Sequence, residues 1–201
     1  MKIHTVIFYL SFFPIVIFGQ KKYKYSYKDG YNFLSKAQKQ IKKGNVENAK
    51  KLIVKAKESN YGFCGNSWAS ANSQIKLIES QILNRENNYN ESLKILESID
   101  KCSYGANCTK RDYLKIETLF LKFGEEKVKS AFKNVNQITK DENDEDENSY
   151  HVYIKDLDYN FSFIESNISF VDKHGKEIVK NKIENPFLNI AQNQLFYELL
   201  E

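Results

Sequence analysis

Beyond its N-terminal segment, the 201-residue chain has no hydrophobic run long enough to cross a bilayer, which takes about 20 apolar residues. It also lacks a strong charge of one sign, because 30 Lys and Arg stand against 26 Asp and Glu. Both signs are mixed along the same segments, which is typical of a solvated helical surface and argues against a nucleic-acid partner. No glycine-rich loop that could hold a phosphate is present.

Metal ligands and nucleophile motifs are scarce as well. Beyond the first segment the only histidines are His151 and His174, and both lie far in sequence from the three cysteines. A structural zinc site needs about four such ligands, so we expect no metal and no cofactor. A thiol nucleophile made of Cys64 and one of these histidines is the sharper alternative, but no nucleophile motif surrounds the cysteine. We therefore expect a protein that is not an enzyme.

The N-terminal segment has the layout of a secretory signal peptide. Lys2 precedes a nearly continuous apolar run from Val6 to Phe18, and a polar segment follows Gly19. Because the run is shorter than a membrane span, we predict a signal peptide over residues 1–19 that is cleaved after Gly19, with an uncleaved anchor as the alternative. The protein is then exported, either periplasmic or secreted, and has no membrane span after cleavage.

The three cysteines predict one disulfide and one thiol left over, because exported proteins fold in an oxidising compartment. Cys102 and Cys108 flank a short segment that contains Gly105, which eases closure of a local bridge. We favour this pairing, and the two pairings that involve Cys64 remain open. In each case the expected role of the disulfide is structural.

Apolar and small residues recur at helical spacing between Tyr31 and Asn60. They form two sets, separated by Gly44 and Asn45. Gly44 fits the left-handed position that ends a helix, and Asn45 can cap the helix that follows. The pattern predicts a helical hairpin. The two sets are Phe33, Leu34, Ala37 and Ile41, and then Val46, Ala49, Leu52, Ile53 and Ala56.

The positions of Ala37, Gly44, Ala49 and Ala56 resemble those of a tetratricopeptide repeat. In that family, small residues lie where the two helices touch and a glycine marks the turn between them. A weaker second copy follows, with Asn87 in the turn. The step from Gly44 to Asn87 is 43 residues, which exceeds the family period of about 34.

The excess length of the second copy is predicted to form an enlarged loop over residues 61–71. This segment contains the aromatic residues Tyr61, Phe63 and Trp68. They either contact a partner protein or cover the exposed end of the first hairpin, and we favour the second interpretation.

A third pair of helices is predicted over residues 110–123 and 125–138, joined at Gly124. It departs from the small-residue pattern, so we interpret it as a repeat-like or capping hairpin. Residues 30–138 together resemble a tetratricopeptide-repeat region. Such repeats need about three units to bury a continuous core.

Residues 139–149 include an acidic run that cannot bury apolar surface, and they are predicted to be a solvated linker. A calcium loop is disfavoured because the glycine of that motif is missing. Residues 150–201 then contain short stretches of aromatic and branched residues that predict strands, and the segment after Pro186 predicts a terminal helix. The expected fold class is mainly α, with stacked helical hairpins and a small C-terminal α+β region.

The resemblance implies a concave face that holds a segment of another protein. Our leading hypothesis is an exported, non-catalytic scaffold or adaptor whose partner is another protein or a peptide. The alternative is an inhibitor or immunity-type protein that binds a secreted effector through the acidic linker and the C-terminal region. The expected contact positions are Asn32, Lys36, Lys39, Trp68, Asn72 and Lys76.

Overall fold

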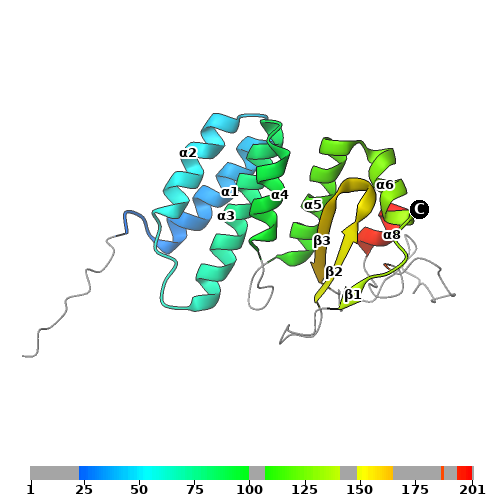
Figure 1. The fold of residues 1–201 in the computed structure, drawn as a ribbon. Helices are drawn as coiled ribbons and strands as arrows, with labels where there is room; N and C mark the ends of the chain where they lie inside the picture. Colours follow the sequence, from blue (N-terminus) through cyan, green and yellow to red (C-terminus); the bar gives the residue numbers. More distant parts are fainter. Residues whose placement is uncertain (1–22, 100–106, 141–148, 165–186, 188–193, 201) are drawn as a thin grey trace, which may run out of the picture.

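The computed structural model describes residues 23–99, 107–140, 149–164, 187 and 194–200. In this part, the chain is mainly helical and carries a small antiparallel sheet toward its C-terminus (Figure 1). The predicted fold class, mainly α with a small α+β region, is confirmed. The predicted signal peptide, Cys102, the acidic run of the linker and His174 lie outside the described residues.

The first six helices form three consecutive hairpins (Figure 1). In each hairpin the first helix packs against the second, and the first helices of successive hairpins also contact each other. The helical hairpins expected from the sequence are therefore present. They are α1 (Tyr27–Lys42) with α2 (Val46–Lys57), α3 (Gly65–Arg85) with α4 (Tyr89–Glu97), and α5 (Cys108–Phe123) with α6 (Glu125–Lys133).

The turns within the hairpins fall where the sequence places them. Gly44, Asn87 and Gly124 all have positive φ, at 75°, 59° and 87°. Glycine adopts this region freely, and asparagine tolerates it better than most other residues. Asn45 caps α2 as predicted, because its side chain accepts a hydrogen bond from the backbone N–H of Asn48.

Two helix ends differ from the expectation. α3 begins at Gly65, so most of the predicted loop over residues 61–71 is helical, and the longer period of the second repeat lies largely in a longer first helix. The polar residues at the start of α3 hide its helical periodicity in the sequence. α6 ends at Lys133 instead of Ile138, although Val135 and Ile138 still pack against the core. Apolar residues can be buried from an extended segment as well as from a helix.

Small residues occupy the contact between paired helices in the first two hairpins. Ala37 and Ala49 are fully buried between α1 and α2. Ser80 and Ser92 take the equivalent places between α3 and α4, and their hydroxyl oxygens are 2.7 Å apart. Serine is small enough to be buried at this contact, and its hydroxyl is satisfied across it.

The sheet has the strand order β1-β2-β3, and both pairs are antiparallel. A short 3-10 helix, η1, joins β2 to β3, and α8 packs against α6. The predicted strands near residues 151–164 are confirmed as β2 and β3, and α8 lies in the predicted terminal helix. The elements are β1 (Thr139–Lys140), β2 (Ser149–Ile154), η1 (Lys155–Leu157), β3 (Tyr159–Ile164) and α8 (Gln194–Leu200).

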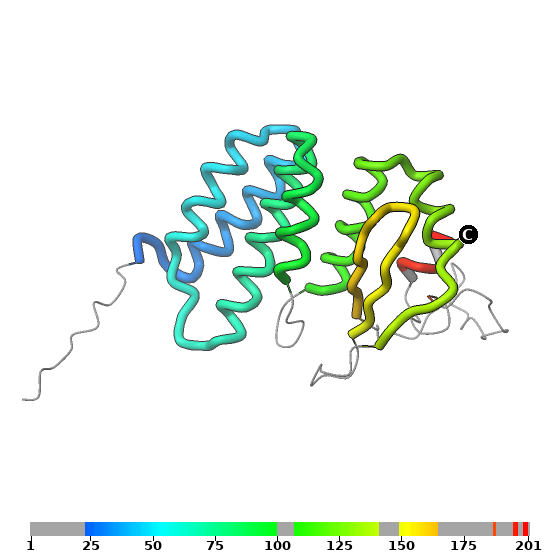
Figure 2. Tube along the Cα trace, viewed as in Figure 1, coloured from blue at the N-terminus to red at the C-terminus, as the bar shows by residue number. Residues whose placement is uncertain are grey.

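Two main hydrophobic cores support the fold. Figure 2 shows the two parts of the chain that contain most of each, α1 to α4 and α5 to α8. The first lies among α1, α2 and α3. The second lies between the third hairpin, the sheet and α8, and five phenylalanines dominate it: Phe132, Phe161, Phe163, Phe187 and Phe196. A smaller cluster of Leu77, Leu96, Ile99 and Leu114 joins α3 and α4 to α5. The strands thus pack on the helices instead of forming a separate layer.

None of the helices in the described ranges combines the length and the apolar character that a membrane crossing requires.

Gly30 provides a test of the packing in the first hairpin. A Cβ atom there would lie 2.8 Å from Cβ of Ser59 and 2.8 Å from the ring of Tyr61. We expect Gly30→Ala to lower the free energy of unfolding by about 1–3 kcal/mol, because buried groups must shift. Gly65→Ala is the matched control, since nothing lies within 4 Å of its Cβ position. Urea denaturation followed by circular dichroism measures both, and equal midpoints would contradict the expectation.

Candidate functional site

A groove runs along α3, with α1 and α5 as its walls. Two adjoining hollows of about 450 and 420 Å³ make up this groove. Gln38 and Lys42 line both hollows, so the groove is continuous. Along α3 the lining extends from Gln74 to Arg85, which corresponds to about 16 Å of helix. A segment of about five extended residues has this length.

A pair of amides forms part of the groove floor. Nε2 of Gln38 donates a hydrogen bond of 2.8 Å to Oε1 of Gln81. The two residues are 43 positions apart, the same step that separates the two turns, so they occupy equivalent places in successive hairpins. Oε1 of Gln38 and Nε2 of Gln81 remain to accept from and donate to a bound main chain. Leu34, Leu77 and Ile78 add apolar surface.

The rim of the groove is mainly basic. Lys39, Lys42 and Lys110 line the first hollow, whereas Lys42, Arg85 and Glu117 line the second. Within the part of the chain that the structure describes, none of these five side chains forms an ion pair. Four basic side chains against one acidic side chain give the groove a positive potential.

The contact positions expected from the sequence are scattered. Lys39 lines the groove. Lys76 donates a hydrogen bond of 2.6 Å to the carbonyl of Ser98 and thereby ties α3 to the end of α4. Asn32, Lys36 and Asn72 are exposed but are not among the residues that line the two hollows.

Trp68, the sixth expected contact, covers the end of the first hairpin. Its indole N–H donates to the carbonyl of Gly62 at 2.8 Å, and its ring lies 5.2 Å from that of Tyr61. Tyr61 is buried and donates to the carbonyl of Ala56, and its burial raises the pKa of the phenol to about 12. Tyr61 and Trp68 thus pack on the first hairpin, whereas Phe63 is fully exposed.

Lys39 is the one expected contact position among the described groove residues, and the residues that were missed include Gln38, Lys42, Gln81 and Arg85. These four form two pairs at the 43-residue step, Gln38 with Gln81 and Lys42 with Arg85. A polar side chain that recurs at the repeat period, on the face opposite the paired helix, is the signal that could have identified them.

Asn84 lies at the floor of the second hollow and is buried. The hydroxyl of Thr118 donates to the carbonyl of Leu114, so its oxygen accepts the 2.8 Å hydrogen bond from Nδ2 of Asn84. The amide oxygen of Asn84 is then fixed in a buried position where the described residues offer it no hydrogen-bond partner. An unpartnered buried acceptor costs about 1–3 kcal/mol.

The structure offers a direct test of this cost. We expect Asn84→Leu to raise the free energy of unfolding by about 1 kcal/mol, because the orphan oxygen is removed. Ile41, at the equivalent place in the first hairpin, shows that an aliphatic side chain fits there. Ser92→Ala is the comparison and should lower stability by about 1 kcal/mol, since its hydroxyl is bonded. Thermal and urea unfolding measure both, and a loss of similar size in the two variants would contradict the expectation.

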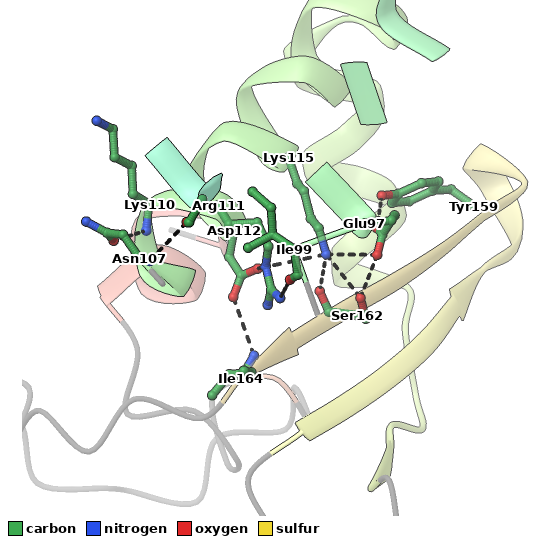
Figure 3. A network of polar contacts seen from close by, with 11 residues as sticks. Glu97, Ile99, Asn107, Lys110, Arg111, Asp112, Lys115, Tyr159, Ser162 and Ile164 are labelled. Carbon is green, nitrogen blue, oxygen red and sulfur yellow. Dashed lines mark hydrogen bonds and ion pairs between the residues drawn. The ribbon is translucent and has the colours of Figure 1, made fainter. Parts of the chain in front are cut away.

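A second feature is a buried polar network where β3 meets the helices (Figure 3). The ammonium of Lys115 is fully buried and donates to the carbonyl and hydroxyl of Ser162 at 2.7 and 3.0 Å, and to Glu97 at 3.1 Å. Ser162 and Tyr159 also donate to Glu97. Burial and the nearby carboxylate raise the pKa of Tyr159. Every N–H of the Lys115 ammonium is therefore used.

Arg111 and Asp112 extend the network along α5 (Figure 3). Nε of Arg111 donates to Asp112 at 2.7 Å, and Nη1 donates to the carbonyl of Ile99 at 2.6 Å. Asp112 also accepts from the backbone N–H of Ile164. Burial raises the pKa of Asp112 against the opposing effect of Arg111, and burial lowers the pKa of Lys115.

The network connects α5 to β3 and has a structural role. Its two cations and two carboxylates balance, and its donors and acceptors are directed at one another. Lys115 satisfies the carbonyl of Ser162 and Asp112 satisfies the N–H of Ile164, so α5 covers the outer edge of β3. An uncovered strand edge would expose these groups to pairing with other chains.

Replacing Lys115 should weaken the attachment of the sheet to α5. We expect Lys115→Met to lower the free energy of unfolding by about 3 kcal/mol, because it leaves the carbonyl of Ser162 without its donor and the partly buried Glu97 without its cation. Lys94→Met is the control, since Lys94 is exposed and its pair with Glu91 spans 3.8 Å. Urea unfolding of both variants checks this, and a change below about 1 kcal/mol for Lys115→Met would contradict it.

The described cysteines and acidic residues show no metal site. In the described ranges, no group of three or more His, Cys, Asp or Glu is placed to hold a metal ion. Cys64 is an exposed free thiol at the start of α3, and hydrogen bonds from the backbone N–H groups of Ser67 and Asn66 lower its pKa. The disulfide between Cys102 and Cys108 stays a prediction.

No protein family, characterised protein or solved structure matches the chain.

Proposed function

We propose that the protein is an exported, non-catalytic scaffold or adaptor of the tetratricopeptide-repeat type, which holds a segment of a partner protein in the groove along α3. The observation that carries this proposal is the continuity of the groove across the first helices of three hairpins. Such grooves are the surfaces that stacked hairpins offer to other chains.

The lining of the groove supports a polypeptide ligand. Gln38 and Gln81 leave one acceptor and one donor on the floor, which is what an extended main chain needs. Because the walls are helices with buried inner faces, few groups have to be ordered when a segment binds. The apolar side chains of Leu34 and Leu77 provide contact area for its side chains.

The repeat relation between the first two hairpins supports the assignment to this repeat type. The turn at Gly44 recurs at Asn87, and the small residues Ala37 and Ala49 recur as Ser80 and Ser92. The predicted signal peptide supports a partner outside the cytoplasm, in the periplasm or the medium.

A capture experiment with two matched variants tests the proposal. The purified protein, Gln81→Trp and Val54→Trp are immobilised and exposed to the exported fraction of the source organism. Gln81 lies on the groove floor, and Val54 is exposed on α2 away from the groove. We expect mass spectrometry to find a partner retained by the unmodified protein and Val54→Trp but lost with Gln81→Trp, because the indole fills the hollow.

Equal retention by all three proteins would contradict the proposal. Several partners whose retention depends on Gln81 indicate a scaffold or adaptor. The alternative, an inhibitor or immunity-type protein that binds through the acidic linker and the C-terminal region, predicts one stoichiometric effector that all three proteins retain.

A further inference from the structure

The charges around the first hollow are of one sign. Lys39 and Lys42 project from α1 and Lys110 from α5, and no carboxylate is among the described residues that line this hollow. Three ammonium groups around one hollow repel each other weakly in water, and the repulsion grows when a ligand excludes solvent. A ligand that brings carboxylates removes this repulsion and replaces it with attraction.

Some lysines of the first hairpin are neutralised within the chain. Lys50 and Lys57 of α2 pair with Glu86 and Glu79 across the contact between the hairpins. The groove lysines form no ion pair with the described residues, and the same is true of the exposed Lys36. Lys39, Lys42 and Lys110 differ from Lys36 because they line one hollow together.

The second hollow has a different balance. Arg85 and Lys42 face Glu117, which lies on α5 at the far end of the groove from Lys110. A carboxylate is therefore favoured more strongly near Lys39 and Lys110 than near Glu117.

We infer that the segment held in the groove is acidic and places its carboxylates over the hollow lined by Lys39, Lys42 and Lys110. The inference rests on the proposed function and specifies the chemistry of the partner. The amides of Gln38 and Gln81 hold the main chain of the segment, and the lysines select its side chains. About five residues span the groove.

Fluorescence anisotropy with labelled peptides tests this inference. The probes are Gly-Glu-Asp-Glu-Asp-Gly and its neutral counterpart Gly-Gln-Asn-Gln-Asn-Gly. We expect the acidic peptide to bind at least about tenfold more tightly than the neutral one at low salt. Its affinity should fall as the salt concentration rises, because salt screens the charges. Equal affinity for the two peptides would overturn the inference.

Charge variants locate the binding. We expect Lys42→Glu to lower the affinity for the acidic peptide about tenfold, because Lys42 lines both hollows. Lys36→Glu is the matched control on α1, since Lys36 is exposed and lines neither hollow, and we expect less than about a twofold change. Glu117→Gln should leave the affinity unchanged or raise it. An equal loss in Lys36→Glu and Lys42→Glu would overturn the inference, because binding would then reflect net charge alone.

The chain has an acidic run of its own, over residues 141–148, which is a competing occupant. A variant in which the Asp and Glu of this run are replaced by Asn and Gln distinguishes this run from a partner segment as the occupant of the groove. Binding of the acidic peptide by this variant alone would overturn the inference, because the groove would then belong to the chain itself. If the acidic peptide fails to bind while capture still depends on Gln81, this inference fails and the proposed function stands.

Discussion

The close approach of paired helices at small residues is the constraint on which the groove depends. Ala37 and Ala49 in the first hairpin, and Ser80 and Ser92 in the second, leave no room for longer side chains between the helices. With their inner faces fixed in this way, α1 and α3 present the opposite faces in register, and Gln38 meets Gln81 across the groove floor. A larger residue at any of these four positions would shift the helices and the floor together.

Local signals in the sequence were sufficient for the hairpins, because each depends on residues only a few positions apart. Positive φ at Gly44 and Asn87 follows from the conformational preferences of these two residue types. The start of α3 was misjudged, since polar residues on its first turns hide the helical period. Lys39 was expected from its place on the first helix, whereas Gln38 and Gln81 could be found only from the 43-residue step, which becomes informative once both hairpins are recognised.

The network around Lys115 could not be predicted from the sequence. Its contacts join residues that are 18 and 47 positions apart, from Lys115 to Glu97 and to Ser162. A lysine in an amphipathic helix is usually solvated, and its burial here depends on a strand edge that needs covering. The two parts of the chain therefore have different roles. The first two hairpins supply most of the groove, and the network attaches the sheet to the third hairpin.

The packing of α6 has a consequence for the end of the helical array. α6 is the last helix of the three hairpins, and it contacts α8 and η1. A further hairpin could not pack on α6 without displacing the phenylalanine core. The C-terminal region therefore closes this end of the hairpin stack.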